Sequence, residues 1–144
     1  MSTAPHIRLV LWKAAKAIDR VDRESIADTG MQLSEFTIME VLLHKGPLPI
    51  NAIGEKVLLT SGAMTAAINR LEKKGFVRRI QDKVDGRIFH VHLTEIGRIV
   101  IRKAYAKHAA NLETVAAPLS HAERNELVRL LKKIGRHAQQ VKLA

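Results

Sequence analysis

The sequence predicts a mainly α-helical protein that carries one small antiparallel β hairpin. Apolar residues recur every three or four positions over most of the 144-residue chain, as they do on one face of a helix. The period changes to alternation only between residues 76 and 93, as expected for two strands. No run of roughly 20 apolar residues occurs, so a transmembrane span is excluded.

Two helices are predicted in the N-terminal part of the chain. The first runs from His6 to about Ala27, and Gly30 then breaks the helical pattern. The second opens at Ser34-Glu35 and ends at Gly46-Pro47, a strong terminator. The first apolar stripe is Ile7, Leu11, Ala14, Ile18 and Val21, and the second is Phe36, Met39, Leu42 and Leu43.

The middle of the chain predicts two helices joined by a tight turn. The first is short, from Asn51 to about Val57, and a turn over Leu58-Leu59-Thr60 follows it. The second runs from about Ser61 to Lys74, where Thr60 or Ser61 can cap its start and Gly75 ends it. Its apolar stripe, which must face the core, is Met64, Ala67, Ile68 and Leu71. The opposite, exposed face consists of Gly62, Thr65, Ala66, Asn69 and Lys73.

Alternating residues next predict a β hairpin. Strands at Phe76–Ile80 and Ile88–Leu93 flank a loop in which Asp85-Gly86 indicates a tight turn. Lys83 and Arg87 give this hairpin a cationic tip. On the second strand we expect the inward residues to be Phe89, Val91 and Leu93.

Two further helices complete the chain. Thr94 caps a long helix that reaches Ala116-Ala117 before Pro118. Ser120 and Glu123 match a capping box at the start of the last helix. We expect the apolar side of the long helix to be set by Ile96, Ile99, Val100 and Ala104. The stripe of the last helix is Leu127, Leu130, Leu131, Ile134, Ala138 and Val141.

The charge of the chain favours a polyanionic partner. Twenty-four Lys and Arg residues outnumber 14 Asp and Glu residues, which gives a formal net charge of +10. Residues 1–35 are neutral overall, so the excess lies in the middle and C-terminal parts. Charge that only keeps the protein soluble is the alternative interpretation. Aromatic residues make up only 3%, which argues against a single-strand binder that stacks bases on aromatic side chains.

The two middle helices and the hairpin together form a winged helix-turn-helix. A helix with a small, polar exposed face fits the major groove of double-stranded DNA, and its leading end can contact base edges. A cation at a hairpin tip, such as Arg87, has little packing to do and suits a phosphate or a minor groove. We therefore predict double-stranded DNA as the partner.

The terminal stripes are too apolar to remain uncovered, and a second copy of the chain can bury them. We therefore predict a homodimer. Residues 1–30 and 99–144 would form its helical dimerisation region, and residues 31–98 would form the DNA-binding domain.

Several motifs together resemble the multiple-antibiotic-resistance regulator (MarR) family of bacterial transcription factors. They are Gly46-Pro47-Leu48, the run from Leu58 to Thr65, Arg70-Leu71-Glu72-Lys73-Lys74-Gly75, Val77-x-Arg79, Asp85-x-Arg87 and Leu93-Thr94-Glu95-x-Gly97-Arg98. The resemblance covers nearly the whole chain and implies a homodimer that represses transcription. It also implies release from DNA by a small aromatic or phenolic effector. The family commonly has an arginine where this chain has Gly86, which leaves the wing one cation poorer.

The resemblance places the recognition helix over Thr60 to Asn69 and a wing contact at Arg87. The expected DNA-binding residues are Thr60, Ser61, Gly62, Thr65, Ala66, Asn69, Arg70, Lys73, Arg79, Lys83 and Arg87. Trp12, His44 and His108 are candidates for the effector pocket. A core or dimer contact is the alternative for Trp12, and a surface position is the alternative for the two histidines.

Other classes of function have less support. The chain has no Cys, which excludes thiol-based sensing and catalysis, and Ser61 lacks the context of a hydrolase nucleophile. His90-x-His92 offers two ligands, too few for a metal site, and no cofactor is expected. The N-terminus lacks the layout of a signal peptide, so we expect a cytoplasmic protein. A nonspecific architectural DNA-binding protein, and a small helical ligand-binding protein or enzyme, remain as alternatives.

Overall fold

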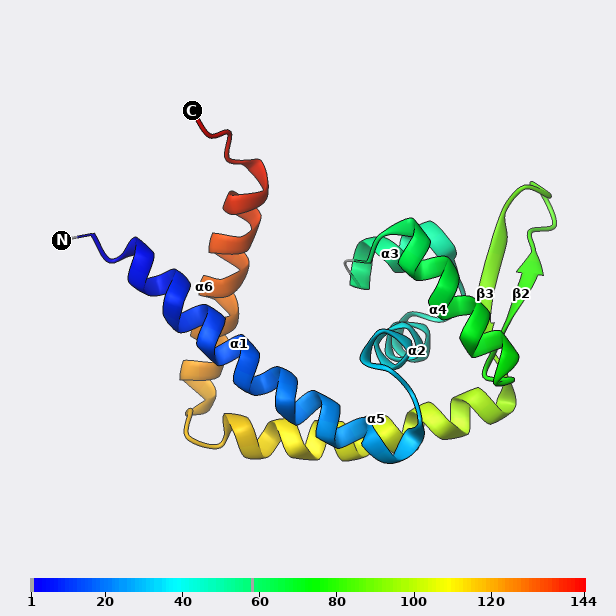
Figure 1. Ribbon diagram of the computed structural model, residues 1–144, viewed down its shortest axis with the longest axis horizontal. Helices are drawn as coiled ribbons and strands as arrows, with labels where there is room; N and C mark the ends of the chain where they lie inside the picture. The colour runs from blue at the N-terminus through cyan, green and yellow to red at the C-terminus, as the bar shows by residue number, and fades with distance from the viewer. Residues whose placement is uncertain (1, 58) are drawn as a thin grey trace.

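The computed structural model describes residues 2–57 and 59–144, so Leu58 of the predicted turn lies outside the described residues. Its mainly helical fold with one small sheet confirms the predicted fold class (Figure 1). In chain order the elements are α1 (Ala4–Ile26), the short 3-10 helix η1 (Ala27–Thr29), α2 (Leu33–Lys45), β1 (Leu48–Pro49), α3 (Ile50–Val57), α4 (Ser61–Lys73), β2 (Val77–Gln81), β3 (Phe89–Leu93), α5 (Glu95–Ala116) and α6 (His121–Gln140).

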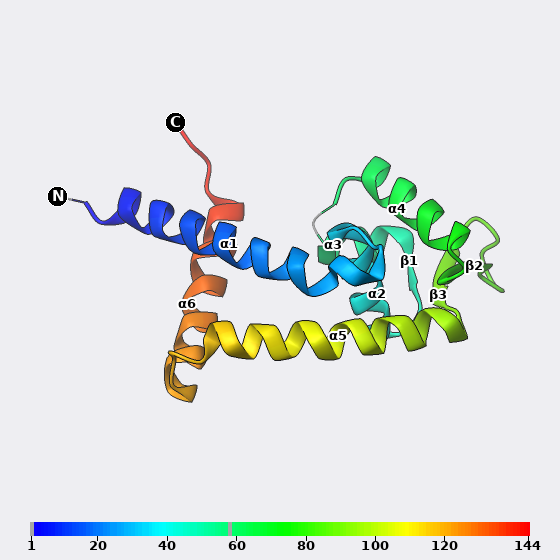
Figure 2. The same ribbon diagram turned by 60° about the horizontal axis from the view of Figure 1, so that its bottom comes forward.

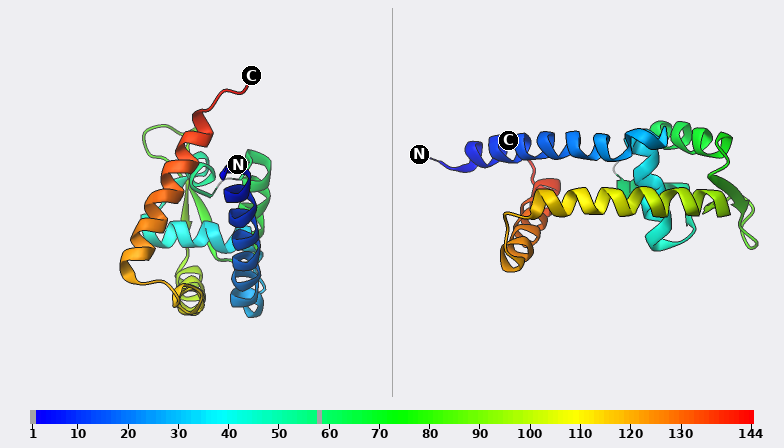
Figure 3. Two further views of the ribbon diagram at one scale, coloured as in Figure 1. Left: turned by 90° about the vertical axis from the view of Figure 1, so that its left-hand side faces the viewer. Right: turned by 90° about the horizontal axis from the view of Figure 1, so that it is seen from below.

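A compact lobe and projecting helices make up the molecule. The lobe contains α2, α3, α4 and the sheet, and α5 runs along it and continues beyond it (Figures 1 and 2). The view from below in Figure 3 shows α1 and α5 side by side, while α6 turns away from the end of α5. No helix of the described chain is long and apolar enough to cross a bilayer.

Helix α2 lies at the centre of the core. A capping box between Gln32 and Glu35 begins it, and Gly46, with a φ of 78°, ends it. Its core side chains are Phe36, Ile38, Met39 and Leu42. The stripe predicted for α4 is also confirmed, because the buried residues of that helix are Met64, Ala67, Ile68 and Leu71.

The sheet contains a third strand that the alternation of residues did not predict. Its order is β1-β3-β2, all antiparallel, and β1 pairs Leu48 with Val91. Two residues are too short for an alternating pattern to be visible. Pro49 lacks an N–H group, which is tolerated because β1 is an edge strand.

The hairpin has the predicted turn but differs from the prediction at Phe89. Phe89 is 42% exposed rather than inward, because it pairs with Gln81 at the outer end of the hairpin. The predicted tight turn at Asp85-Gly86 is confirmed, since Ile88 donates its N–H to the Asp85 carbonyl at 3.0 Å, although Gly86 does not adopt a positive φ. The Asp82 carboxylate organises the preceding part of the loop, by accepting the N–H groups of Val84 and Asp85 at 2.9 and 2.8 Å.

Helix α5 buries a different face from the one that its apolar residues predicted. Ile96 and Ile99 are 62% and 64% exposed. Gly97 faces inward because a Cβ there would lie 1.9 Å from the Phe76 carbonyl oxygen. This close approach of backbone to backbone sets the face of the helix, whose buried residues are Gly97, Ile101, Ala104 and His108.

The outer helices carry apolar stripes that this chain leaves uncovered. The Ser120–Glu123 capping box begins α6 as predicted, but no residue of α6 is buried. Ile7 and Leu11 on α1 are 46% and 42% exposed. The large apolar residues exposed on α6 are Leu127, Val128, Leu130, Leu131 and Ile134.

Candidate nucleic-acid interface

The first turn of α4 is capped and exposed. Thr60 is the N-cap, and its hydroxyl accepts the N–H of Ala63 at 3.2 Å. The Thr65 hydroxyl donates to the Ser61 carbonyl at 3.0 Å, so its oxygen keeps free lone pairs. As predicted, one face of the helix is exposed and consists of Gly62, Thr65, Ala66, Asn69 and Lys73. This face combines small side chains with hydrogen-bonding groups.

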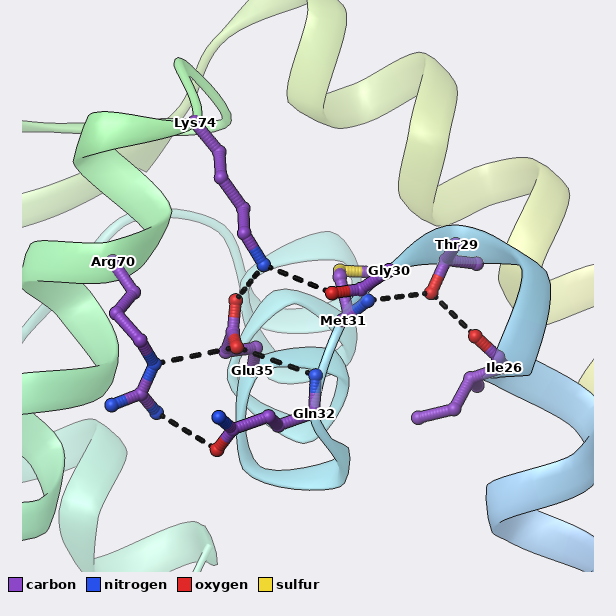
Figure 4. A network of polar contacts seen from close by, with 8 residues as sticks. All are labelled: Ile26, Thr29, Gly30, Met31, Gln32, Glu35, Arg70 and Lys74. Carbon is purple, nitrogen blue, oxygen red and sulfur yellow. Dashed lines mark hydrogen bonds and ion pairs between the residues drawn. The ribbon is translucent and has the colours of Figure 1, made fainter.

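A buried carboxylate joins α4 to the start of α2. Glu35 is 1% exposed, and Figure 4 shows it between Arg70 of α4 and Lys74, the residue that follows this helix. Lys74 Nζ lies 2.7 Å from one carboxylate oxygen, and Arg70 Nε lies 3.4 Å from the other. Arg70 also donates to Gln32 Oε1 at 3.3 Å, and Lys74 donates to the Gly30 carbonyl at 3.2 Å. We call Glu35, Arg70, Lys74 and Gln32 the Glu35 cluster. It fixes the C-terminal half of α4.

A second set of contacts joins α4 to the hairpin. Arg79 on β2 forms an ion pair with Glu72 and donates from Nη2 to Asn69 Oδ1 at 2.8 Å. Glu72 and Asn69 are three residues apart and therefore lie on neighbouring positions of the helix surface. The side chain of Arg79 is only 26% exposed. Arg79 thus fixes the relative position of helix and hairpin, although the sequence suggested only a DNA contact for it.

The cations of the hairpin tip are accessible. The Arg87 side chain is 90% exposed and forms a two-pronged ion pair with Asp85, with both distances at 3.0 Å. The Arg87 guanidinium holds the pKa of Asp85 below its ordinary value. Lys83 is exposed in the same loop. Part of the charge of Arg87 is therefore neutralised within the wing.

One histidine of β3, His92, does not add to this positive surface at neutral pH. Burial lowers the pKa of His92 below its ordinary value, and Arg78 and His90 lower it further. His90 Nδ1 lies 3.8 Å from Asp82 Oδ1. Within residues 2–57 and 59–144, no three His, Cys, Asp or Glu side chains group in a way that could hold a metal ion.

The three residues suggested for an effector lie on three different helices, α1, α2 and α5. Trp12 on α1 is 54% exposed, with Lys16 Nζ 5.2 Å from its ring centroid. His44 is exposed and packs edge-on against Tyr105. His108 is 7% exposed, 2.6 Å from Asp22 Oδ1, so the surface alternative for this residue is wrong.

A pocket lies instead where α1, α2 and α3 meet. Its volume is about 550 Å³. Sequence reasoning missed it because its walls come from three separate segments, and it shares Gln32 with the Glu35 cluster. The lining residues are Arg23, Ile26, Met31, Gln32, Leu33, Ser34, Thr37, Val57 and Leu59. One cation, two hydroxyls and several apolar side chains therefore surround one space.

The chain is similar to known transcriptional regulators. The family model described as MarR family matches residues 31–89. The uncharacterized HTH-type transcriptional regulator YkoM of Bacillus subtilis is 38% identical over 128 residues, 87% of this chain and 83% of that protein. The HTH-type transcriptional regulator MhqR of Bacillus subtilis is 32% identical over 132 residues, 92% of this chain and 91% of that protein. These relatives are transcriptional regulators, not enzymes.

The fold is shared with solved structures as well. BpsR of Bordetella bronchiseptica superimposes with a TM-score of 0.81 at 20% identity, covering 90% of this chain and 92% of that one. A likeness at this level of identity concerns the fold alone.

Proposed function

Because the chain belongs to the MarR family of transcriptional regulators, we propose that it represses transcription by binding a pseudo-palindromic operator as a homodimer. We further propose that a small aromatic or phenolic effector releases it from DNA. The observation that carries the proposal is the exposed face of α4, which begins at a capped N-terminus and lies beside an accessible cationic wing.

The exposed face of α4 supports a role in base recognition. Gly62 and Ala66 are small, so they let the helix approach a groove closely. Thr65 and Asn69 lie four residues apart on the same side of the helix and offer hydrogen-bonding groups to the bases. Thr60 and Ser61 lie at the helix N-terminus, where hydroxyls and free N–H groups suit a phosphate. Lys73 extends the same face towards the DNA backbone.

The wing supports a role in binding phosphate or the minor groove. Arg87 and Lys83 project from the loop that Asp82 organises. The ion pair of Arg87 with Asp85 is solvent-exposed and therefore weak, so Arg87 can exchange Asp85 for a phosphate. In this proposal Arg70 and Arg79 act mainly by holding α4 in place, because both are already bound within the chain.

The uncovered stripes of α1 and α6 support the homodimer. They belong to helices that project from the lobe, so a second copy can cover them without touching α4 (Figure 3). A two-fold axis would place two copies of α4 about 34 Å apart, one helical turn of DNA. Residues 1–30 and 99–144 are thus proposed as the dimerisation region.

The pocket between α1, α2 and α3 supports the effector. Arg23 suits a carboxylate or phenolate, and the apolar walls suit an aromatic ring. The DNA binding of BpsR is regulated by 6-hydroxynicotinic acid, a small aromatic acid. Because the pocket shares Gln32 with the Glu35 cluster, a ligand there can alter the position of α4.

Selection from a random pool of duplexes tests the proposed function. The full chain should enrich an inverted repeat whose half-site centres lie about 10 base pairs apart. The Thr65→Ala variant should enrich the same repeat less strongly. Recovery of unrelated sequences by the wild type would refute sequence-specific binding and would favour a nonspecific architectural protein.

A further inference from the structure

We propose that Arg79 orients the side-chain amide of Asn69 so that its NH₂ group alone is offered to DNA, and that Asn69 thereby selects a base with hydrogen-bond acceptors. This inference rests on the proposed function, in which α4 enters the major groove. It assigns Asn69 a chemical preference and makes Arg79 a positioning residue for specificity.

The orientation of the Asn69 amide follows from the chemistry of its partner. A guanidinium group has only N–H donors, so the amide atom 2.8 Å from Arg79 Nη2 must be the oxygen. A flipped amide would lose this hydrogen bond and would place its NH₂ group against a cation. In the part of the chain that the structure describes, the NH₂ group of Asn69 donates to no protein acceptor. It is therefore free for an external partner.

Arg79 is itself held in place. Its other guanidinium nitrogen pairs with Glu72, and its backbone lies in β2 opposite Val91, which is fully buried. Glu72 and Asn69 belong to the same helix, so the three side chains form one rigid connection between α4 and the hairpin. The amide orientation is fixed before DNA is bound.

A fixed NH₂ group distinguishes between base edges. In the major groove guanine offers two acceptors and thymine offers one, whereas cytosine offers a donor. Adenine is usually recognised by an asparagine that presents its oxygen and nitrogen side by side. Asn69 cannot do this while its oxygen is turned to Arg79, because its NH₂ group could reach only the N7 acceptor of adenine and would meet the N6 donor beside it. We therefore expect guanine or thymine at the base that Asn69 contacts.

Three variants of the full chain test this inference by selection of duplexes followed by sequencing. Arg79→Ala releases the Asn69 amide, so the preference for adenine at one position of each half-site should rise roughly tenfold. Asn69→Asp keeps the pairing with Arg79 but removes the donor, so the same position should shift to cytosine or adenine. Arg78→Ala is the matched control, because Arg78 is an exposed cation on the same strand. Its selected sequence should equal that of the wild type.

The outcomes separate this inference from the proposed function. A wild type that selects no sequence refutes both. A wild type that selects an inverted repeat retains the proposed function, and the inference then fails if Arg79→Ala keeps every base preference unchanged. It also fails if the position altered in Asn69→Asp is adenine in the wild-type site. Circular dichroism of each variant confirms that the helices are intact.

Discussion

Gly97 allows α5 to begin directly against the backbone of Phe76. A Cβ at this position would lie 1.9 Å from a carbonyl oxygen, and backbone atoms cannot move aside as a flexible side chain can. We expect Gly97→Ala to lower the free energy of unfolding by about 2–3 kcal/mol. Gly62→Ala is the control, since nothing lies within 4 Å of a Cβ there and alanine favours helix. Thermal unfolding without DNA measures both, and equal midpoints would show that the helix–backbone contact is not tight.

Asp82 makes the order of the wing depend on pH. The N–H groups of Asp85 and Val84 lower the pKa of its carboxyl below the ordinary value of 3.8. A lowered pKa means that the contribution of this carboxylate to the loop is complete above pH 3.8 and is lost as the pH falls through the lower, folded value. In an NMR titration, the amide signals of Val84 and Asp85 should shift with a common midpoint below 3.8. A midpoint at or above this value would contradict the loop geometry.

Among the elements, the Glu35 cluster joins the recognition helix to α2. Lys74→Ala would leave the buried Glu35 carboxylate with the longer contact to Arg70, which should cost about 1–3 kcal/mol of stability. Lys73→Ala is a matched control, because Lys73 is exposed and forms no ion pair within the described residues. It should change stability by less than about 0.5 kcal/mol. Urea unfolding distinguishes the two variants, and equal urea midpoints would show that the Glu35 cluster does not stabilise the protein.

Adding Glu35→Gln to Lys74→Ala tests the electrostatic cause. An amide needs no counter-charge, so the double variant should be more stable than the sum of the single effects predicts. Simple additivity would mean that packing rather than charge stabilises this junction.

The elements that could be predicted from the sequence are those defined by local patterns. Helix α4, its cap Thr60 and its exposed face follow from residues within one or two turns of each other. The partners of Arg70 and Lys74 could not be predicted in this way, because Glu35 lies 35 and 39 residues away. The face of α5 was missed for a related reason, since it depends on a contact between Gly97 and the distant Phe76 backbone rather than on apolar residues.

For the whole molecule, the uncovered α1 and α6 stripes predict a stable dimer. The wild type should sediment as two copies at micromolar concentration. Leu131→Glu, in the middle of the α6 stripe, should sediment as one copy, because burying a charge in an apolar interface is costly. Asn125→Glu adds the same charge to the opposite side of the helix and should leave the dimer intact. A wild type that is monomeric at micromolar concentration would refute the dimer.

The pocket predicts that ligand binding weakens DNA binding. Aromatic acids or quinone-like compounds that bind the protein in calorimetry should weaken operator binding by about 5- to 150-fold, a coupling of about 1–3 kcal/mol. Ser34→Trp should fill the pocket and abolish ligand binding. Ligand binding that survives in Ser34→Trp would place the effector elsewhere.

The central claim is that α4 recognises bases while the wing binds the DNA backbone. Affinities for the selected operator and for random duplex, measured by fluorescence anisotropy at several salt concentrations, test it most directly. Thr65→Ala should lose about 1–3 kcal/mol on the operator and far less on random duplex, because only a base contact is lost. Arg87→Ala should weaken both complexes and lower the salt slope by about two per dimer, one per wing. The claim would be contradicted if Arg87→Ala left the salt slope unchanged and Thr65→Ala lost the same affinity for both duplexes.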